Sequence, residues 1–462
     1  MNVALLADFG STFTKVVAVD LDEGAIVGQS QSPNALDGEI LDGYDDAVGA
    51  ALSEIAGPST VVLELAASSA GGGLRMAAVG LVRSLTALAA KTAALNAGAR
   101  LESVLAGNLT SEDAALLRQL EPEIVLFAGG TDGGQERLVL HNAEAIAGSL
   151  ASSHVVVACN STVATSVQAI FEPVALSVTV VPNVLPDLNL TRTDETREAI
   201  AAVFIDHVIA GKHLSASDRF RGLVTMATPD AVLRAARLYA EMAEGAASDN
   251  GVVVTDVGGA TTDVYSVQRR RPAGGFGIRR KGIVSLPVMR TVQGDLGLRS
   301  SAPTVLEADR LFLQAQFDSP AWLAAACERR RSKPTSLFPS GCDRRLDDTL
   351  AVACMSRSME RHFGSRSVQV GLGGRPVMVQ EEPDLTACRL LVAGGGILRA
   401  GSDPEDLVQQ ALQRLPPSSL APRRCQVVVD RRYVLSAAGL LSRNHPRIAE
   451  VLLRKELPEV IP

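Results

Sequence analysis

The chain has 462 residues, of which 47% are hydrophobic and only 3% are aromatic. This length predicts two or three domains, and the composition excludes a disordered chain and a disulfide-stapled scaffold. The net charge of −7 disfavours nucleic acid as a partner, because a nucleic-acid backbone selects a basic surface. The six cysteines include no C-x-x-C pair, so we expect reduced thiols and a cytoplasmic location.

The first predicted element is a strand from Val3 to Ala7, which leads into Asp8 and the turn Gly10-Ser11-Thr12. The residues before Asp8 include no basic region, which argues against a signal peptide. A second β-branched run begins at Val16, so we predict a hairpin and not a strand that enters a helix. Glycine lets the backbone of such a turn approach phosphate oxygens, and Lys15 can neutralise phosphate charge.

Strands and helices alternate between about residues 70 and 190, which predicts an α/β lobe inserted into the first half. The charge-free stretch between Glu144 and Glu172 carries scattered polar residues, so it predicts no membrane span. The loop Gly129 to Gly134 follows a strand and opens a helix, which is typical of an anion or partner contact and equally of a tight turn. The expected strands are 61–65, 101–106, 123–128, 155–158 and 175–181, and the expected helices are 81–96, 111–120 and 135–150.

A helix is predicted from Thr228 to Met242, with Thr228 as its cap and Pro229 in its first turn. The stretch Gly245 to Asn250 ends this helix. We therefore place a first domain at 1–245, which includes the lobe, and a second domain at 250–462.

The segment around Asp256 repeats the segment around Asp8 at an offset of 248 positions (256 minus 8). The offset superimposes Gly10 on Gly258 and Thr14 on Thr262, so we predict two related halves that each contain a strand, a turn and a strand. Hydroxyl groups in the second turn can bond a terminal phosphate. The candidate nucleotide-binding residues of the second half are Gly258, Gly259, Thr261 and Thr262.

A third glycine loop, Gly394-Gly395-Gly396, follows an apolar strand that ends at Ala393. Two hairpins that face each other across a cleft would hold a nucleotide triphosphate from both sides. Asp8 and Asp256 each follow the first strand of a hairpin, where they can hold Mg²⁺ through its water shell. The chain contains neither G-x-G-x-x-G nor the P-loop pattern, which excludes those two nucleotide sites. The candidate catalytic acids are Asp8, Asp256 and Asp263.

Three basic clusters follow residue 268, at 269–271, 279–281 and 329–331. They indicate either solvated loops or a docking face for an acidic protein or for nucleotide phosphates. The six histidines lack metal-ligand spacing, and no G-x-S-x-G nucleophile pattern occurs. We therefore assign neither a protein-bound transition metal nor a serine nucleophile.

The two hairpins and the third glycine loop resemble the phosphate 1, phosphate 2 and adenosine motifs of the actin, sugar kinase and Hsp70 ATPase superfamily. This resemblance implies an α/β fold with two duplicated ribonuclease-H-like domains around a nucleotide cleft. By the same resemblance, 228–242 and 433–439 are the two connecting helices. Hsp70-like members place Glu before the proline of the first of these helices, where this chain has Thr228. The acid that orients water stays open among Asp230, Asp256 and Asp263, and we expect slow ATP hydrolysis.

Longer strings resemble the MutL-type reactivating factor of adenosylcobalamin-dependent glutamate mutase, which is unrelated to the mismatch-repair protein of that name. The resemblance implies a chaperone that uses ATP and Mg²⁺ to release damaged cobalamin from a mutase, so that intact coenzyme can bind. Its partners would be mutase subunits and not a membrane. The alternatives are a small-molecule kinase of the same superfamily and an actin-like protein whose assembly is controlled by nucleotide. The strings lie at 66–80, 125–134, 183–186 and 290–299.

Overall fold

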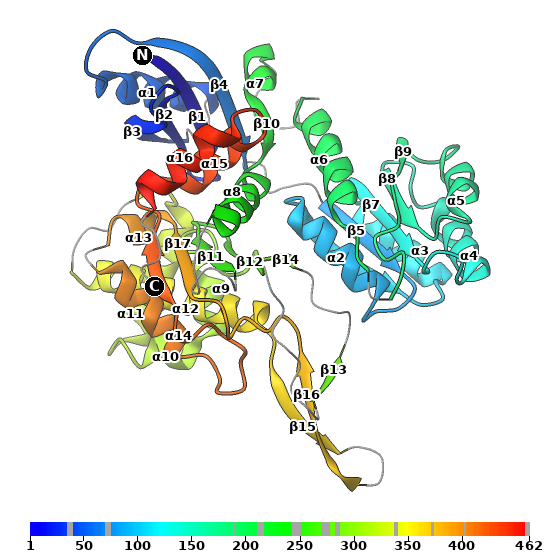
Figure 1. Cartoon of the computed structure of the whole chain (residues 1–462). Helices are drawn as coiled ribbons and strands as arrows, with labels where there is room; N and C mark the ends of the chain where they lie inside the picture. Colours follow the sequence, from blue (N-terminus) through cyan, green and yellow to red (C-terminus); the bar gives the residue numbers. More distant parts are fainter. Residues whose placement is uncertain are drawn as a thin grey trace. The chain divides into compact units, whose positions relative to one another are not determined.

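The computed structural model describes residues 1–34, 40–69, 75–188, 190–209, 217–242, 251–268, 278–281, 287–336, 341–370, 374–401 and 403–457. The predicted helix end at 245–250 and the basic cluster at 269–271 lie outside the described residues. The chain forms two compact units (Figure 1). We call them the body, which comprises Met1–Ala70, Ser217–Arg279 and Pro287–Pro462, and the lobe, which comprises Gly71–Ala216 and Arg280–Leu286.

The first half of the body is built on a five-stranded sheet with the order β10-β4-β1-β2-β3. The hairpin predicted around Asp8 is confirmed, because β1 and β2 are antiparallel and pair Asp8 with Lys15. β3 is antiparallel to β2, whereas β4 and β10 continue the sheet in parallel to β1. The elements are β1 (Asn2–Phe9), β2 (Phe13–Asp20), β3 (Ala25–Pro33), α1 (Ile40–Ser53), β4 (Thr60–Ser68), α7 (Asp218–Leu223) and β10 (Val224–Ala227).

The second half of the body repeats this sheet with the order β14-β12-β11-β17-β18. β11 and β12 form the second predicted hairpin, in which Asp256 pairs with Asp263. β14 is antiparallel to β12, and β17 and β18 are parallel to β11. Two sheets with the same strand order and directions confirm the two related halves that the repeat predicts, and they establish the duplicated ribonuclease-H-like domains that the resemblance implies. The strands are β11 (Val252–Val257), β12 (Thr262–Val267), β14 (Val288–Gln293), β17 (Leu390–Gly394) and β18 (Gln426–Val429).

Two helices, α8 (Thr228–Met242) and α15 (Val434–Ser442), pack between the two sheets and form a common core with both halves. Small residues let their backbones meet: a Cβ on Gly439 of α15 would stand 1.9 Å from the carbonyl oxygen of Ala231 in α8. The last helix, α16 (Pro446–Glu456), packs against the same core. These are the two connecting helices that the sequence predicts.

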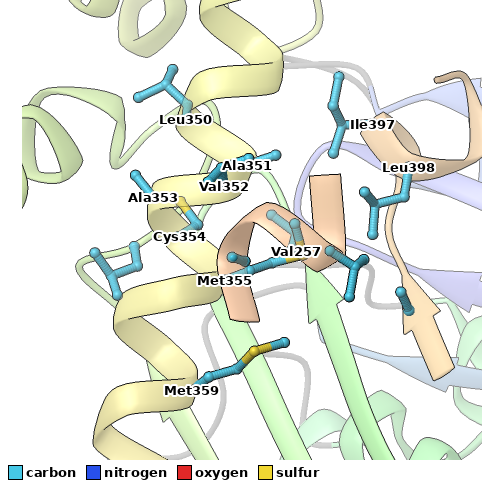
Figure 2. Close-up of a cluster of buried hydrophobic side chains, with 14 of the residues drawn as sticks. Val257, Leu350, Ala351, Val352, Ala353, Cys354, Met355, Met359, Ile397 and Leu398 are labelled. Atoms are coloured by element: carbon cyan, nitrogen blue, oxygen red, sulfur yellow. The ribbon is translucent and has the colours of Figure 1, made fainter. Parts of the chain in front are cut away.

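A second core lies on the other face of the β14-β12-β11-β17-β18 sheet and contains the long helix α12 (Gly341–His362). Figure 2 shows the apolar residues of α12 between Leu350 and Met359 beside Val257 of β11 and beside Ile397 and Leu398. After α12 the chain forms the hairpin of β15 (Arg366–Val370) and β16 (Pro376–Glu381), to which β13 (Ile278–Lys281) adds a third strand. The remaining helices of this half are α9 (Ala302–Ala308), α10 (Arg310–Gln314), α11 (Pro320–Ser332), α13 (Gly396–Arg399) and α14 (Pro404–Gln413).

The lobe is a separate α/β unit with a parallel sheet in the order β6-β5-β7-β8-β9. It includes α6, beyond the limit near residue 190 that the sequence predicts. Its first helix, α2, begins at Thr86 and not at Leu81, because the Thr86 hydroxyl accepts hydrogen bonds from the backbone of Leu81 and Val82 and holds them in a turn. The elements are β5 (Arg75–Gly80), α2 (Thr86–Asn96), β6 (Arg100–Ala106), α3 (Ser111–Leu120), β7 (Ile124–Gly129), α4 (Glu136–Ala147), β8 (His154–Cys159), α5 (Ala164–Phe171), β9 (Ser177–Val180) and α6 (Asp194–Ile209).

The loop Gly129 to Gly134 follows β7 and is hydrogen-bonded to neighbouring segments of the lobe. Asp132 accepts hydrogen bonds from Ser161 N and Asn183 Nδ2, both at 2.9 Å. The amides of Asp132 and Gly133 donate to Pro186 O and Asn160 Oδ1, both at 3.0 Å. A carboxylate at the centre and amides already engaged indicate a tight turn rather than an anion site.

The cluster 329–331 corrects one expectation, because its central residue is neither solvated nor available for docking. Arg329 and Arg331 are exposed on α11, whereas Arg330 is completely buried. The helical period turns successive side chains by about 100°, so one member of the triplet faces the core.

Two expectations from composition concern the whole chain. All six cysteines are free, and four of them are buried. None of the described helices combines the length and the apolar character that a membrane-spanning segment needs.

The contact between α8 and α15 predicts how the body tolerates side chains. Gly439→Ala should lower the free energy of unfolding by about 1–3 kcal/mol, because its methyl group overlaps the Ala231 carbonyl. The control is Gly49→Ala in α1, where a Cβ meets no atom within 4 Å. That change should stabilise the chain by about 0.5–1 kcal/mol through helix propensity. Urea unfolding of both variants measures these free energies. An unchanged free energy of unfolding in Gly439→Ala would contradict the close contact between α8 and α15.

Candidate functional site

A pocket lies between the two halves of the body, at the edge where the strands of both sheets end. Strands β1 and β2 contribute Asp8 and Lys15, and β11 contributes Asp256. These three residues were predicted from the sequence, and the structure brings them together. The other lining residues are Thr228, Val232, Val254, Gly394, Gly395, Asp430, Tyr433, Leu435 and Ser436.

Asp8 is bonded to a hydroxyl and to an ammonium group in this pocket. Its Oδ1 accepts a hydrogen bond of 2.6 Å from the hydroxyl of Thr228, and its Oδ2 lies 3.3 Å from the Lys15 ammonium. Burial by itself lowers the pKa of Lys15. The negative charge of Asp8, together with Tyr433 and Asp256, outweighs this effect, so the pKa of Lys15 is raised above its ordinary value. Lys15 is therefore a fixed positive charge at the centre of the pocket.

Among the described residues that line the pocket, Asp256 and Asp430 have no cation other than Lys15, which is paired with Asp8. Burial raises the pKa of Asp256 to about 6; the charge of Lys15 opposes this rise, and Asp263, Asp8 and Asp430 add to it. Burial also raises the pKa of Asp430, although the backbone amides of Leu435 and Val434 donate to its carboxylate at 3.0 and 2.8 Å. The pocket thus holds more acid than base and favours a bound cation.

The two predicted glycine turns have matching geometry. Gly10 N donates to Phe13 O at 3.1 Å, and Gly258 N donates to Thr261 O at 2.8 Å. A Cβ on Gly10 or Gly258 would stand 2.8 or 3.0 Å from the same carbonyl oxygens, so a side chain would strain either turn. The turns also meet each other, because a Cβ on Gly259 would stand 3.0 Å from the Thr12 hydroxyl. Backbone of both hairpins is thereby available at one place.

The hydroxyl groups of the two turns, of which those of Thr261 and Thr262 are predicted to bond phosphate, separate into two classes. Ser11 is exposed and Thr12 is partly exposed, and their hydroxyls lie 3.5 Å apart. Thr262 is completely buried and its hydroxyl donates to Leu296 O at 2.8 Å, so this hydroxyl holds the turn in place and faces away from solvent. The Thr261 hydroxyl donates to Asp263 at 3.3 Å.

The candidate acids also separate into those that line the pocket and those that are paired with arginine outside it. Asp263 is paired with Arg290, whose Nε lies 2.8 Å from its carboxylate, and Asp230 is paired with Arg234 at 2.9 Å. Neither Asp263 nor Asp230 is among the residues that line the pocket, whereas Asp8 and Asp256 are.

The third glycine loop begins beside the pocket. A Cβ on Gly394 would stand 3.3 Å from Asp256 Oδ1, and Gly395 has a positive φ of 119° that disfavours other residues. Gly396 then opens α13. The loop therefore presents bare backbone next to Asp256.

Tyr433 is a pocket residue whose side chain the sequence reasoning missed. Its ring contacts two cations, the Lys15 ammonium at 4.5 Å and the Arg399 guanidinium at 4.8 Å from the ring centroid. Its hydroxyl donates to Gln31 in the first half at 3.1 Å, and its φ of 56° is left-handed, which is uncommon for a non-glycine residue. The contacts link the two halves across the pocket.

Asp430 was also missed, although the sequence contains a signal for it. It follows the apolar run Val427 to Val429, just as Asp8 and Asp256 follow apolar strands. Parallel strands end at one edge of a sheet, so an acid just after β18 lies at the same edge as Asp256 near the end of β11.

The residues fit a hydrated divalent cation better than a directly bound one. In the described part of the chain, no three His, Cys, Asp or Glu residues are grouped to hold a metal ion. The oxygen donors of Asp8, Asp256 and Asp430 suit Mg²⁺, which keeps most of its water. Mg²⁺ would supply positive charge that neutralises phosphate oxygens there.

The raised pKa of Asp256 predicts a pH-dependent stability difference. Between the ordinary aspartate pKa and about 6, the folded chain binds more protons at Asp256 than the unfolded chain, so this residue costs stability as pH rises. Asp256→Asn should therefore be more stable than the wild type by about 1–3 kcal/mol near pH 7.5, and the difference should shrink near pH 4.5. Urea unfolding at both pH values measures it, with Asp318→Asn at an exposed position as control. A wild type that is the more stable protein near pH 7.5 would contradict the burial of this charge.

Among solved structures, a ROK family glucokinase from Streptomyces griseus in complex with glucose and AMPPNP is 13% identical with a TM-score of 0.33, and the match covers 98% of this chain and 99% of that one. A glycerol dehydratase reactivase is 10% identical with a TM-score of 0.35, covering 95% of this chain and 99% of that one. The fold assignment rests on the strand order and directions of the two sheets.

The sequence comparisons are more specific. Protein MutL of Clostridium tetanomorphum is 33% identical over 468 residues, and the match covers 100% of both chains. The model of the family described as MutL protein matches residues 4–457. The resemblance seen in the sequence is confirmed, and the chain belongs to the MutL protein family.

Proposed function

We propose that this chain is an ATP-dependent reactivating chaperone that releases damaged cobalamin from an adenosylcobalamin-dependent mutase, such as glutamate mutase, so that intact coenzyme can bind. The observation that carries the proposal is membership of the MutL protein family over residues 4–457. The acidic pocket between two duplicated halves supports the ATP dependence. ATP and Mg²⁺ are then the chain's cofactors, cobalamin is only the partner's coenzyme, and the partners are mutase subunits.

The pocket residues divide the work of binding Mg²⁺-ATP between the two halves. Asp8 and Lys15 come from the first half and Asp256 from the second, so a ligand held by all three contacts both. The turns that begin at Gly10 and Gly258 would bring the backbone of both hairpins close to phosphate oxygens, and glycine allows this close approach, although the amides of Gly10 and Gly258 are themselves bonded within the turns. A ligand that contacts both halves favours the arrangement in which both contacts are made, so bound nucleotide selects a conformation of the body.

Slow hydrolysis is consistent with this use of nucleotide. Asp263 and Asp230 are held in ion pairs with Arg290 and Arg234, and Thr228 stands where a glutamate would orient water. Asp256 is the acid in this set that lines the pocket, and its raised pKa suits an exchange of protons near neutral pH. We assign the orientation of water to Asp256 within this proposal.

The nucleotide site can be tested without a partner. Asp8→Ala and Asp256→Ala should each weaken the binding of Mg²⁺-ATP by at least about tenfold in calorimetry, because each removes a carboxylate that holds the hydrated cation. Asp318→Ala, at an exposed position, is the matched control and should bind normally. Circular dichroism confirms that each variant is folded. Unchanged affinity in both pocket variants would remove the nucleotide site from the proposal.

The reactivating activity needs a mutase assay. A mutase that holds cobalamin without its adenosyl group should regain activity on incubation with this chain, Mg²⁺-ATP and fresh adenosylcobalamin. Lys15→Ala should abolish the recovery because it removes the one lysine of the pocket, whereas Lys91→Ala on the exposed side of α2 should preserve it. Transfer of labelled phosphate to a metabolite, or ATP-dependent sedimentation, would instead support a kinase or an assembly protein. The proposal would be refuted if none of the mutases that are encoded near this chain regained activity.

A further inference from the structure

A segment of the second half, residues 296–301, is held along the whole of the second phosphate turn. Leu298 N and Arg299 N donate to the carbonyls of Gly258 and Gly259 at 3.1 and 2.7 Å. The Ser301 hydroxyl donates to Ala260 O at 2.7 Å. Because each successive carbonyl of the turn is bonded to this segment, neither can move without the other.

The side chain of Arg299 starts at this turn and ends in a buried ion pair. Its Cγ would lie 3.5 Å from a Cβ on Gly259, so its stem covers the turn. Its guanidinium donates to both oxygens of Asp347 in α12, at 3.0 and 3.1 Å. The Arg299 and Asp347 side chains are 11% and 3% exposed, so water screens this bidentate pair little.

Asp347 is shared with a second guanidinium. Arg330 of α11 donates to the same Asp347 Oδ1 at 2.7 Å and has no exposed surface. It also donates to Ala326 O at 3.0 Å and to Asp343 Oδ1 at 3.1 Å. Asp343 lies in the first turn of α12. A buried arginine is costly unless it is fully paired, so loss of one partner forces the others to rearrange.

We propose that Arg299 is a positioning residue that couples the second phosphate turn to helices α11 and α12 through Asp347 and Arg330. The inference rests on the proposed function, since it places the phosphates of ATP at this turn. Phosphate at the turn shifts Gly258–Thr261 and with it the backbone of Arg299, and its negative charge competes with Asp347 for the guanidinium. Asp347 then bonds Arg330 alone. Arg330 joins α11 to the start of α12. The nucleotide state thereby changes the packing of two helices that do not touch the nucleotide.

Hydrogen exchange of the full chain measures this coupling directly. In the wild type, Mg²⁺-ATP should slow amide exchange in the turn at 258–262 and also in α11 and α12, and ADP should have a smaller effect on the helices. In Arg299→Gln the turn should still respond to ATP, while the response of the helices should fall at least about twofold, because Gln cannot form the bidentate pair. Asp347→Asn should behave alike, and the double variant should lose no more than either single one, as expected for partners in one network.

Two further variants separate coupling from a general loss of structure. Arg344→Gln, on the same helix, removes an ion pair with Asp348 at 3.0 Å outside this network and should keep the full response. Arg299→Lys keeps the charge without the planar fork and should show an intermediate response, which also serves if Arg299→Gln does not fold. An unchanged helix response in Arg299→Gln or Arg299→Lys would overturn the inference, as would wild-type helices that do not respond to bound ATP.

The same protein samples distinguish this inference from the proposed function. Helices that respond to ATP through Arg299 in a chain that revives no mutase would support the coupling and refute the reactivating activity. Recovery of mutase activity in Arg299→Gln at the wild-type level, with unchanged helix exchange, would overturn the coupling and leave the proposed function in place.

Discussion

The close crossing of α8 and α15 is the constraint on which the site depends. With no room for a side chain at Gly439, the two helices meet backbone to backbone and hold both sheets around one core. Each helix begins at the pocket, α8 at Thr228 and α15 just after Asp430 and Tyr433. The positive ends of both helix dipoles therefore point toward the pocket and stabilise the carboxylates gathered there.

The carboxylates of the pocket are arranged for binding at some cost in stability. Lys15 offsets Asp8, but Asp256 and Asp430 have no further cation among the lining residues and their pKa values are raised by burial. A folded chain without ligand keeps this excess of negative charge. Under the proposed function, Mg²⁺-ATP would offset this negative charge, so binding of the ligand would favour the arrangement in which the two halves lie close together.

The duplicated halves are equal in topology and unequal in chemistry. At the strand position opposite Asp8 the first half has Lys15, and at the position opposite Asp256 the second half has Asp263. The residue after β10 is Thr228, which donates to Asp8, and the residue after β18 is Asp430, which accepts from α15. The first half thus supplies Lys15 together with its partner Asp8, and the second half supplies Asp256 and Asp430. The second turn is tied to α12 through Arg299.

Local sequence determined the elements and the repeat. Alternating apolar strands, the glycine turns and the offset between Asp8 and Asp256 depend on short-range sterics and periodicity, so the two hairpins, the connecting helices and the α/β lobe were predictable. Pocket membership was predictable for Asp8, Lys15 and Asp256, because each sits at the end of a hairpin strand or beside one. Only the tertiary structure decided which polar groups face the pocket: it directs Thr262 to Leu296 and Asp263 to Arg290, buries Arg330, and brings the Tyr433 ring into contact with Lys15 and Arg399. These contacts join residues far apart in the chain, and their partners are selected by packing between elements, which no local pattern encodes.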